Sequence, residues 1–245
     1  MRRFLVQLEF QGKRYSGWQK QANANTVQEE VERALSKLFG VDTPSFGCSR
    51  TDAGVSAERY FFHFDADTKL PADRVAYKLN RFLPKDVQAQ SSREVPLSFD
   101  ARKSFKEKTY TYSFYISDHI RPLLSSDHVQ IEPPFDLEKV KSEATCLIGT
   151  HDFASFRTIG YENNEKKTTV RTISHVGFTE NEGELIISVT GDGFLYNMVR
   201  IVCGTLVEIG TGKLTDLKGI LDAKDRSRAG KTLPPKGLKL KDVQY

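Results

Sequence analysis

The chain has 245 residues, of which 38% are hydrophobic and 28% charged, and its formal net charge is +4 at pH 7. This length suffices for one large domain or two small ones, each with its own core. No segment approaches the run of about 18 apolar residues that a membrane-spanning helix needs, and the N-terminal stretch lacks the apolar region and cleavage site of a signal peptide. The three Cys residues lie far apart, which argues against a disulfide framework or a zinc site and favours a reducing compartment, most simply the cytoplasm.

The first hundred residues contain the patterns of two strands and two helices. Apolar and polar residues alternate over 4–10, which predicts a half-buried strand. Thr26, with Glu29 three residues later, has the pattern of a helix N-cap and capping box, and Gly40 closes that helix. The aromatic stretch at 59–64 predicts a second strand, and a second amphipathic helix is expected from 71 or 72 to 82, ended by Pro84.

A similar order follows after residue 100. Strands are expected at 108–116 and 184–191, and a helix at 136–149. The segment 194–210 repeats apolar residues at helical spacing from Leu195 to Ile209 and ends at Gly210. Each half therefore mixes strands and helices, which predicts an α+β fold of two sheet-plus-helix halves, residues 1–100 and 101–245.

The stretch CSRTDAGVSA (48–57) combines residue types that a plain turn does not need. Gly54 can adopt a positive φ and so allows a sharp turn just after Asp52. Arg50 could fold beside the carboxylate and favour its ionised form, which would keep Asp52 a competent nucleophile or base. The alternative is an Arg–Asp pair that only braces the loop.

Other candidate residues are weaker when taken singly. Tyr110 lies on one strand face with Tyr112 and Phe114, as a core aromatic would, although an aromatic ring at the edge of a pocket can stack on a nucleobase. Arg200 is expected about two turns into its helix, away from the apolar face, where exposure to solvent is the simplest interpretation. The segment 224–241 holds seven basic residues and one acidic residue, as a solvated surface or an RNA-binding segment can. The usual phosphate-loop, metal and Ser-nucleophile motifs are absent.

Taken together and in order, these stretches resemble the tRNA pseudouridine synthase A family over nearly the whole chain. FQGKRYSGWQKQ (10–21) resembles the family's YDG..Y.GWQ.Q opening, and CSRTDAGVSA resembles its active-site loop GRTDAGVHA. Five further blocks follow in the expected order: LNRFLPKDV, FDARKSFKEKTYTY, GTHDFASF, FLYNMVRIVCGTLVEIG and AGKTLPPKGL. Two residues depart from the pattern, Ser49 in place of Gly and Ser56 in place of His, which leaves the loop conformation and the RNA fit open.

The resemblance implies a role for each matching residue. Asp52 would be the catalytic aspartate, Arg50 would brace the site, and Arg200 would pair with Asp52 in a cleft between the two halves. Tyr110 would stack against the target uracil. Further residues implied in substrate binding are Thr51 and Leu195, and in weaker RNA contacts Lys231, Lys236 and Arg102.

The resemblance also implies the fold and the activity. The expected fold is two ferredoxin- or RRM-like halves that form one continuous mixed eight-stranded sheet with helices on one face. The implied activity is an isomerase that converts uridine to pseudouridine in the tRNA anticodon stem-loop, at tRNA positions 38–40 in the family, after base flipping. No cofactor or metal is implied, and the implied partners are tRNA and a second copy of the chain.

Two other functions stay open at the level of the sequence. A catalytically silent tRNA-binding or chaperone protein could keep the same fold, although it has no reason to keep a carboxylate facing an anionic partner. A phosphatase-like hydrolase with an Asp nucleophile would need Mg²⁺ held by further carboxylates, and no second acidic residue lies close to Asp52 in a suitable pattern.

Overall fold

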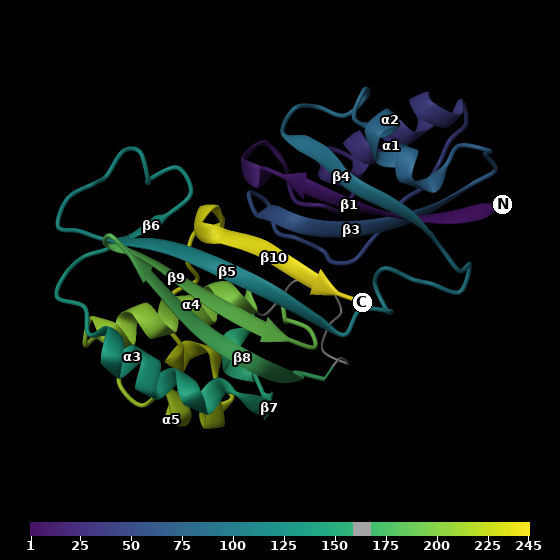
Figure 1. The fold of residues 1–245 in the computed structure, drawn as a ribbon. Helices are drawn as coiled ribbons and strands as arrows, with labels where there is room; N and C mark the ends of the chain where they lie inside the picture. Colours follow the sequence, from purple (N-terminus) through teal and green to yellow (C-terminus); the bar gives the residue numbers. More distant parts are fainter. Residues whose placement is uncertain (159–167) are drawn as a thin grey trace. The chain divides into compact units, whose positions relative to one another are not determined.

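The computed structural model describes residues 1–158 and 168–245. The chain forms two compact units, one of Met1–Lys106 with Lys239–Tyr245 and one of Glu107–Leu238 (Figure 1). Both units combine strands that pair in parallel and antiparallel directions with helices, so the predicted α+β class is confirmed. The single continuous sheet and the ferredoxin-like halves stay predictions.

The first unit is built on four strands in line with a fifth, short strand beside them. In the order β4–β1–β3–β10 the first three strands are antiparallel and β10 is parallel to β3, while β2 pairs with β3. The core is aromatic, because the side chains of Phe4, Phe62 and Phe64 are fully buried. The bounds are β1 (Arg2–Phe10), β2 (Phe46–Gly47), β3 (Ser56–Ala66), β4 (Val87–Val95) and β10 (Leu238–Gln244).

Two helices, α1 (Val27–Phe39) and α2 (Val75–Leu79), lie on the same side of these strands (Figure 1). The predicted ends of α1 are confirmed: the Thr26 hydroxyl accepts a hydrogen bond from the Glu29 N–H, and Gly40 ends the helix with a φ of 75°. Helix α2 is shorter than the predicted 71–82 segment, which begins with a 3₁₀ turn at Ala72–Arg74. After Leu79 the chain changes to tighter turns, in which the Arg81 N–H donates to the Lys78 carbonyl and the Phe82 N–H to the Leu79 carbonyl, and Pro84 disfavours a helical backbone at the residue before it.

The second unit has the strand order β5–β9–β8–β7, all antiparallel, with the short β6 parallel to β5. Helices α3, α4 and α5 lie together on one face of this sheet (Figure 1). The bounds are β5 (Glu107–Ile116), β6 (Val129–Ile131), β7 (Gly149–Asp152), β8 (Val170–Asn181), β9 (Glu184–Gly191), α3 (Leu137–Ala144), α4 (Met198–Gly210) and α5 (Leu217–Ala223).

Helix α4 differs from its prediction in where it begins. The pattern predicted a helix over 194–210, but α4 begins at Met198, because Asn197 has a φ of 61° and this left-handed backbone cannot lie inside a right-handed helix. Arg200 therefore lies in the first turn of the helix, not two turns into it, and Leu195 precedes the helix. Most of α4 is buried, including Ile201, Cys203 and Leu206.

Within the described parts of the chain, residues 1–158 and 168–245, none of the helices has the length and apolar character needed to cross a membrane.

Candidate active site

Asp52 begins a tight turn between β2 and β3. The Val55 N–H donates to the Asp52 carbonyl at 3.2 Å, and Gly54, the third residue of the turn, has a φ of 81°. A positive φ at the third position is the geometry of a type II turn, which glycine adopts at little cost. The predicted sharp turn after Asp52 is thus present, and it leaves the carboxylate on a half-buried residue at the start of the turn.

A neighbouring segment packs against this turn backbone to backbone. We call residues 11–21 the clamp loop. The Gly54 N–H donates to the Tyr15 carbonyl at 3.0 Å. A Cβ atom on Gly17 would lie 2.2 Å from the Thr51 carbonyl oxygen, and one on Gly12 would lie 2.1 Å from the Val55 carbonyl oxygen. Since no side chain fits at either position, glycine is required for this contact.

An aromatic stack lies beneath the residues that lead into the turn. The Tyr60 hydroxyl donates to the Ser49 carbonyl at 2.5 Å, and the Trp18 ring stacks on Tyr60 with 4.3 Å between ring centroids. A Cβ on Gly47 would meet both rings, 2.1 Å from the Tyr60 oxygen. Trp18 is only 2% exposed, so its ring is packed inside the first unit.

The three consecutive residues Arg50, Thr51 and Asp52 differ in their exposure to solvent. Arg50 is exposed and Thr51 is 9% exposed, with Asp52 between these extremes. The Thr51 hydroxyl is buried and has no hydrogen-bond partner among the described residues. A buried hydroxyl without a partner costs about 1–3 kcal/mol.

The two departures from the family pattern both have a place in the fold. The Ser56 hydroxyl accepts a hydrogen bond from the Gly12 N–H at 3.0 Å and so ties the clamp loop to the start of β3. Ser49 contributes its carbonyl to Tyr60. Neither contact involves the side chain of Asp52.

Tyr110 and Leu195 belong to the second unit. Tyr110 lies on β5 opposite Val189 of β9 and is 7% exposed. Its ring packs edge-on against Phe194, with 5.2 Å between centroids, and Leu195 follows as a half-buried residue just before α4. Tyr110 is thus near the segment that leads into α4.

The Arg200 side chain makes hydrogen bonds at the start of α4. Its Nε donates to the Leu233 carbonyl at 2.7 Å, and its Nη1 donates to the Asn197 Oδ1 at 2.6 Å. Asn197 in turn donates to the Thr158 hydroxyl at 2.9 Å. The Tyr112 hydroxyl donates to the Pro234 carbonyl at 2.5 Å, so Arg200 and Tyr112 hold two consecutive carbonyls of the 229–238 segment.

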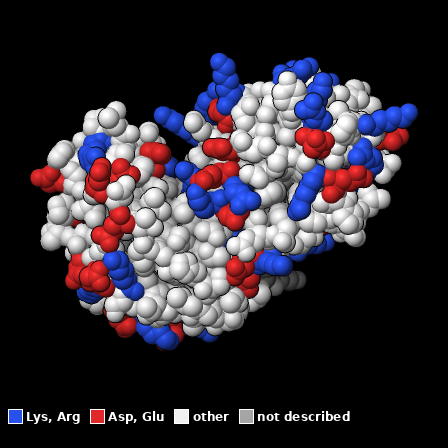
Figure 2. All heavy atoms as spheres, viewed as in Figure 1, with Lys and Arg blue, Asp and Glu red and all other residues white. Residues whose placement is uncertain are grey.

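Three basic residues named from the resemblance are exposed: Arg102, Lys231 and Lys236. The Lys236 Nζ donates to the Ser125 carbonyl at 2.6 Å, and the Lys231 backbone N–H donates to Glu208 at 3.1 Å. On the face drawn in Figure 2, acidic side chains are interspersed among the basic ones. On that face the basic side chains therefore do not form one continuous patch.

Sequence reasoning missed several residues that shape the first unit. The Tyr15 hydroxyl donates to Asp86 at 2.8 Å, which ties the clamp loop to the start of β4, and burial together with this bond raises the pKa of Tyr15. The Gln28 side chain, described below, was also missed. The blocks around 15–18 and 84–86 were noted only as resemblances, and the position of Tyr15 between Gly12 and Gly17 was the signal that could have drawn attention to them.

The structure therefore places Asp52 at the start of a turn in the first unit, with Arg50 and Thr51 directly before it, and Tyr110, Leu195 and Arg200 around the start of α4 in the second. In residues 1–158 and 168–245, no three His, Cys, Asp or Glu side chains are grouped so that they could hold a metal ion.

Comparisons with known proteins identify close relatives over the full length. A family model described as tRNA pseudouridine synthase matches residues 144–245. A protein of Ruminiclostridium cellulolyticum named tRNA pseudouridine synthase A is 42% identical over 248 residues, and one of Clostridium acetobutylicum with the same name is 41% identical over 248 residues; in both cases 100% of each chain is covered. Among solved structures, a Cbf5-Nop10-Gar1 complex is similar to 98% of this chain and 48% of that chain, with a TM-score of 0.47 and 11% identity. The structural likeness is too loose to support a statement about function.

Proposed function

The chain belongs to the tRNA pseudouridine synthase A family, and from this premise we propose that it converts uridine to pseudouridine in the anticodon stem-loop of tRNA, with Asp52 as the catalytic residue. Its activity as a tRNA pseudouridine synthase, an isomerase, follows from full-length relatives at about 40% identity and from the family model. The position of the target uridine and the roles of single residues are the proposal.

The observation that carries the proposal is the turn at Asp52. A carboxylate stands on a half-buried turn whose backbone is fixed by the Tyr15 carbonyl and by glycine contacts. A carboxylate held in this way can act in the reaction as nucleophile or base without further reorganisation.

A carboxylate can serve this reaction in more than one way. The N1–C1′ bond of uridine breaks, the base turns, and a C1′–C5 bond forms; the proton at C5 leaves to solvent and N1 gains a proton, so the conversion is balanced without a redox partner. Asp52 acts by attack at C1′, by attack at C6, or by removal of the C2′ proton. Extrusion of the base from its stack costs a few kcal/mol.

The remaining site residues support this chemistry. Tyr110 stacks on the uracil, which returns about 1–3 kcal/mol of the cost of flipping. Thr51, next to Asp52 in the chain, contributes to substrate binding. Arg50 and Arg200 supply positive charge beside Asp52 and the phosphates of the tRNA backbone. Leu195 provides an apolar contact for the substrate.

The wider contacts follow from the same proposal. Residues 1–100 carry the Asp52 loop, and 101–245 supply Tyr110 and Arg200. The exposed Arg102, Lys231 and Lys236 contact the RNA backbone, so affinity falls with salt. The enzyme acts in the cytoplasm as a homodimer and without a cofactor.

The test is release of tritium from a tRNA transcript labelled at uracil C5, in the presence of EDTA. The wild type is expected to release tritium, and Asp52→Asn is expected to lose release by about 10⁴-fold while it still binds tRNA. Binding without release by the wild type would show instead a silent tRNA-binding protein. Release that depends on a metal ion would contradict the proposed chemistry.

A further inference from the structure

The clamp loop, which fixes the Asp52 turn, is itself fixed to the first turn of α1. The Val27 N–H donates to the Gly17 carbonyl at 3.2 Å, and the Gln28 N–H donates to the Trp18 carbonyl at 3.0 Å. The first N–H groups of a helix have no partner within the helix, so the clamp loop satisfies two of them. The position of the loop is therefore coupled to the position of α1.

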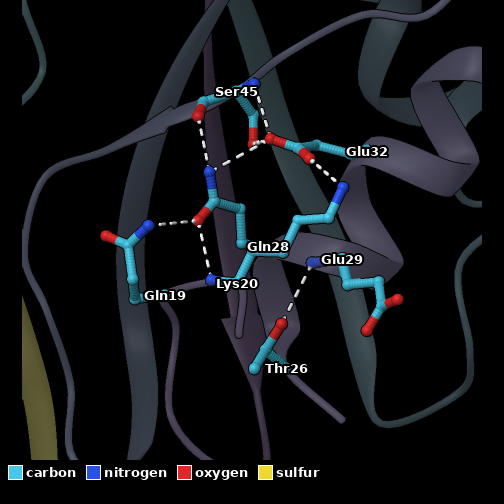
Figure 3. A network of polar contacts seen from close by, with 7 residues as sticks. All are labelled: Gln19, Lys20, Thr26, Gln28, Glu29, Glu32 and Ser45. Carbon is cyan, nitrogen blue, oxygen red and sulfur yellow. Dashed lines mark hydrogen bonds and ion pairs between the residues drawn. The ribbon is translucent and has the colours of Figure 1, made fainter. Parts of the chain in front are cut away.

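The side chain of Gln28 joins this loop to a second segment (Figure 3). Its Oε1 accepts from the Lys20 N–H at 3.0 Å and from the Gln19 side chain at 3.2 Å. Its Nε2 donates to the Ser45 carbonyl at 2.9 Å and to Glu32 at 3.0 Å. A glutamine amide has two donors and room for two acceptor contacts, so Gln28 is fully used.

The second segment leads directly into the Asp52 turn. Ser45 is 2% exposed and stands immediately before β2, seven residues ahead of Asp52. Glu32 accepts from the Ser45 N–H at 3.0 Å and forms an ion pair with Lys20 at 3.2 Å. Gln28 and Glu32 therefore hold the chain that enters the turn and the loop that packs against it.

We propose that Gln28 is a positioning residue for Asp52. The Gln28 side chain holds the clamp loop and the segment at Ser45 in fixed positions relative to each other. The effect reaches Asp52 along two routes: through Gly17 and Tyr15, which contact Thr51 and Gly54, and through β2. A catalytic group must be held within about 0.5 Å of its productive position. Hydrogen bonds from the residues that surround the site, such as those of Gln28, provide this support. The inference rests on the proposed catalytic role of Asp52.

The test replaces Gln28 by methionine, which keeps the length of the side chain and removes all four hydrogen bonds. The matched control is Gln88→Met, because Gln88 is also half-buried in the first unit and donates to the Pro84 and Val87 carbonyls at 3.0 Å each. Single-turnover rates at saturating enzyme are compared with the Kd for the tRNA transcript, so that the chemical step is separated from binding.

Gln28→Met is expected to lower the single-turnover rate by roughly 10- to 100-fold and to leave the Kd within about twofold, since misplacement of the reacting group costs rate more than affinity. Gln88→Met is expected to leave both unchanged. Trp18 is the single tryptophan of the chain and lies in the clamp loop, so its fluorescence should shift to the red in Gln28→Met and not in Gln88→Met.

If Gln28→Met does not fold, Gln28→Glu and its combination with Glu32→Gln take its place. The double variant, in which glutamine and glutamate have changed places, restores a hydrogen bond between positions 28 and 32. Its single-turnover rate should be at least about twofold higher than that of Gln28→Glu alone. A folded Gln28→Met with the wild-type rate and unshifted fluorescence would overturn the inference, as would an exchange that recovers nothing. Absence of tritium release from the wild type would instead defeat the proposed function, and the Trp18 shift would still decide whether Gln28 holds the loop.

Discussion

The Asp52 turn of the first unit and the Arg200 segment of the second are held by different kinds of contact. The turn is fixed by main-chain atoms: one hydrogen bond from Gly54 and the close approach of Gly12 and Gly17. Arg200 is fixed by side-chain atoms, on the Leu233 carbonyl and on Asn197. The first arrangement should therefore fail when a methyl group is added, and the second when a polar group is removed.

The largest effect is expected from Gly17→Ala. The new Cβ would meet the Thr51 carbonyl, and a φ of 86° is unfavourable for alanine, so unfolding free energy should fall by about 3 kcal/mol or more and activity should be lost with it. Gly40→Ala is the control, because its φ is 75° but its Cβ would meet nothing within 4 Å, and it should cost only about 1 kcal/mol. Urea denaturation measures both; equal losses would show that the close approach to Thr51 is unimportant.

Asn197→Ala tests the side-chain arrangement of the second unit. It removes the bonds to Arg200 and Thr158 and places alanine at a φ of 61°, which should cost about 2 kcal/mol of stability and lower the tritium-release rate. Asn197→Gly loses the same bonds without the backbone cost. The glycine variant should therefore be more stable than the alanine variant by about 1 kcal/mol and equally slow; a glycine variant with full activity would separate Asn197 from the function of Arg200.

Tyr112→Phe sharpens the comparison with a smaller change. The hydroxyl holds the Pro234 carbonyl, next to the Leu233 carbonyl that Arg200 holds, so its removal should cost about 1 kcal/mol. Tyr77→Phe is the control, because Tyr77 is 60% exposed, and it should stay within about 0.5 kcal/mol of the wild type. Thermal unfolding of both variants checks the difference, and equal melting temperatures would contradict it.

The smallest effect concerns pH and the first unit alone. Burial, and then the positive charge of Arg3, lower the pKa of His63, whose Nδ1 accepts from the Ala101 N–H at 3.1 Å. The folded protein therefore takes up the proton less readily than the unfolded chain, so this contribution to stability is present above about pH 6.5 and is lost as pH falls through the folded pKa.

His63→Asn keeps an acceptor near Ala101 and does not titrate. The urea midpoint of the wild type should fall between about pH 7.5 and 5.5 by more than that of His63→Asn. If the urea midpoints of both proteins fall in parallel with pH, His63 is not the group that titrates. That outcome would not bear on how the Asp52 turn and the Arg200 segment are held.

Features that depend on neighbouring residues were predicted correctly from the sequence. The N-cap at Thr26, the end of α1 at Gly40 and the turn after Asp52 each follow from a few adjacent residues. The start of α4 was predicted wrongly, because apolar spacing continues through 194–197 while the left-handed Asn197 interrupts the helix. Strand β10 was missed, although Leu238 and Leu240 alternate with lysines, because the basic residues suggested a surface segment.

The amino-acid sequence by itself determined the α+β class, the family resemblance and the turn that carries Asp52, because periodicity, caps and motifs are properties of short segments. Only the tertiary structure decided that β10 pairs with β3, that Gly17 fits against Thr51, and that Gln28 joins the clamp loop to Ser45. These contacts join residues that are distant in the chain, and their geometry depends on how the strands and helices of the unit pack. No local pattern in the sequence encodes that packing.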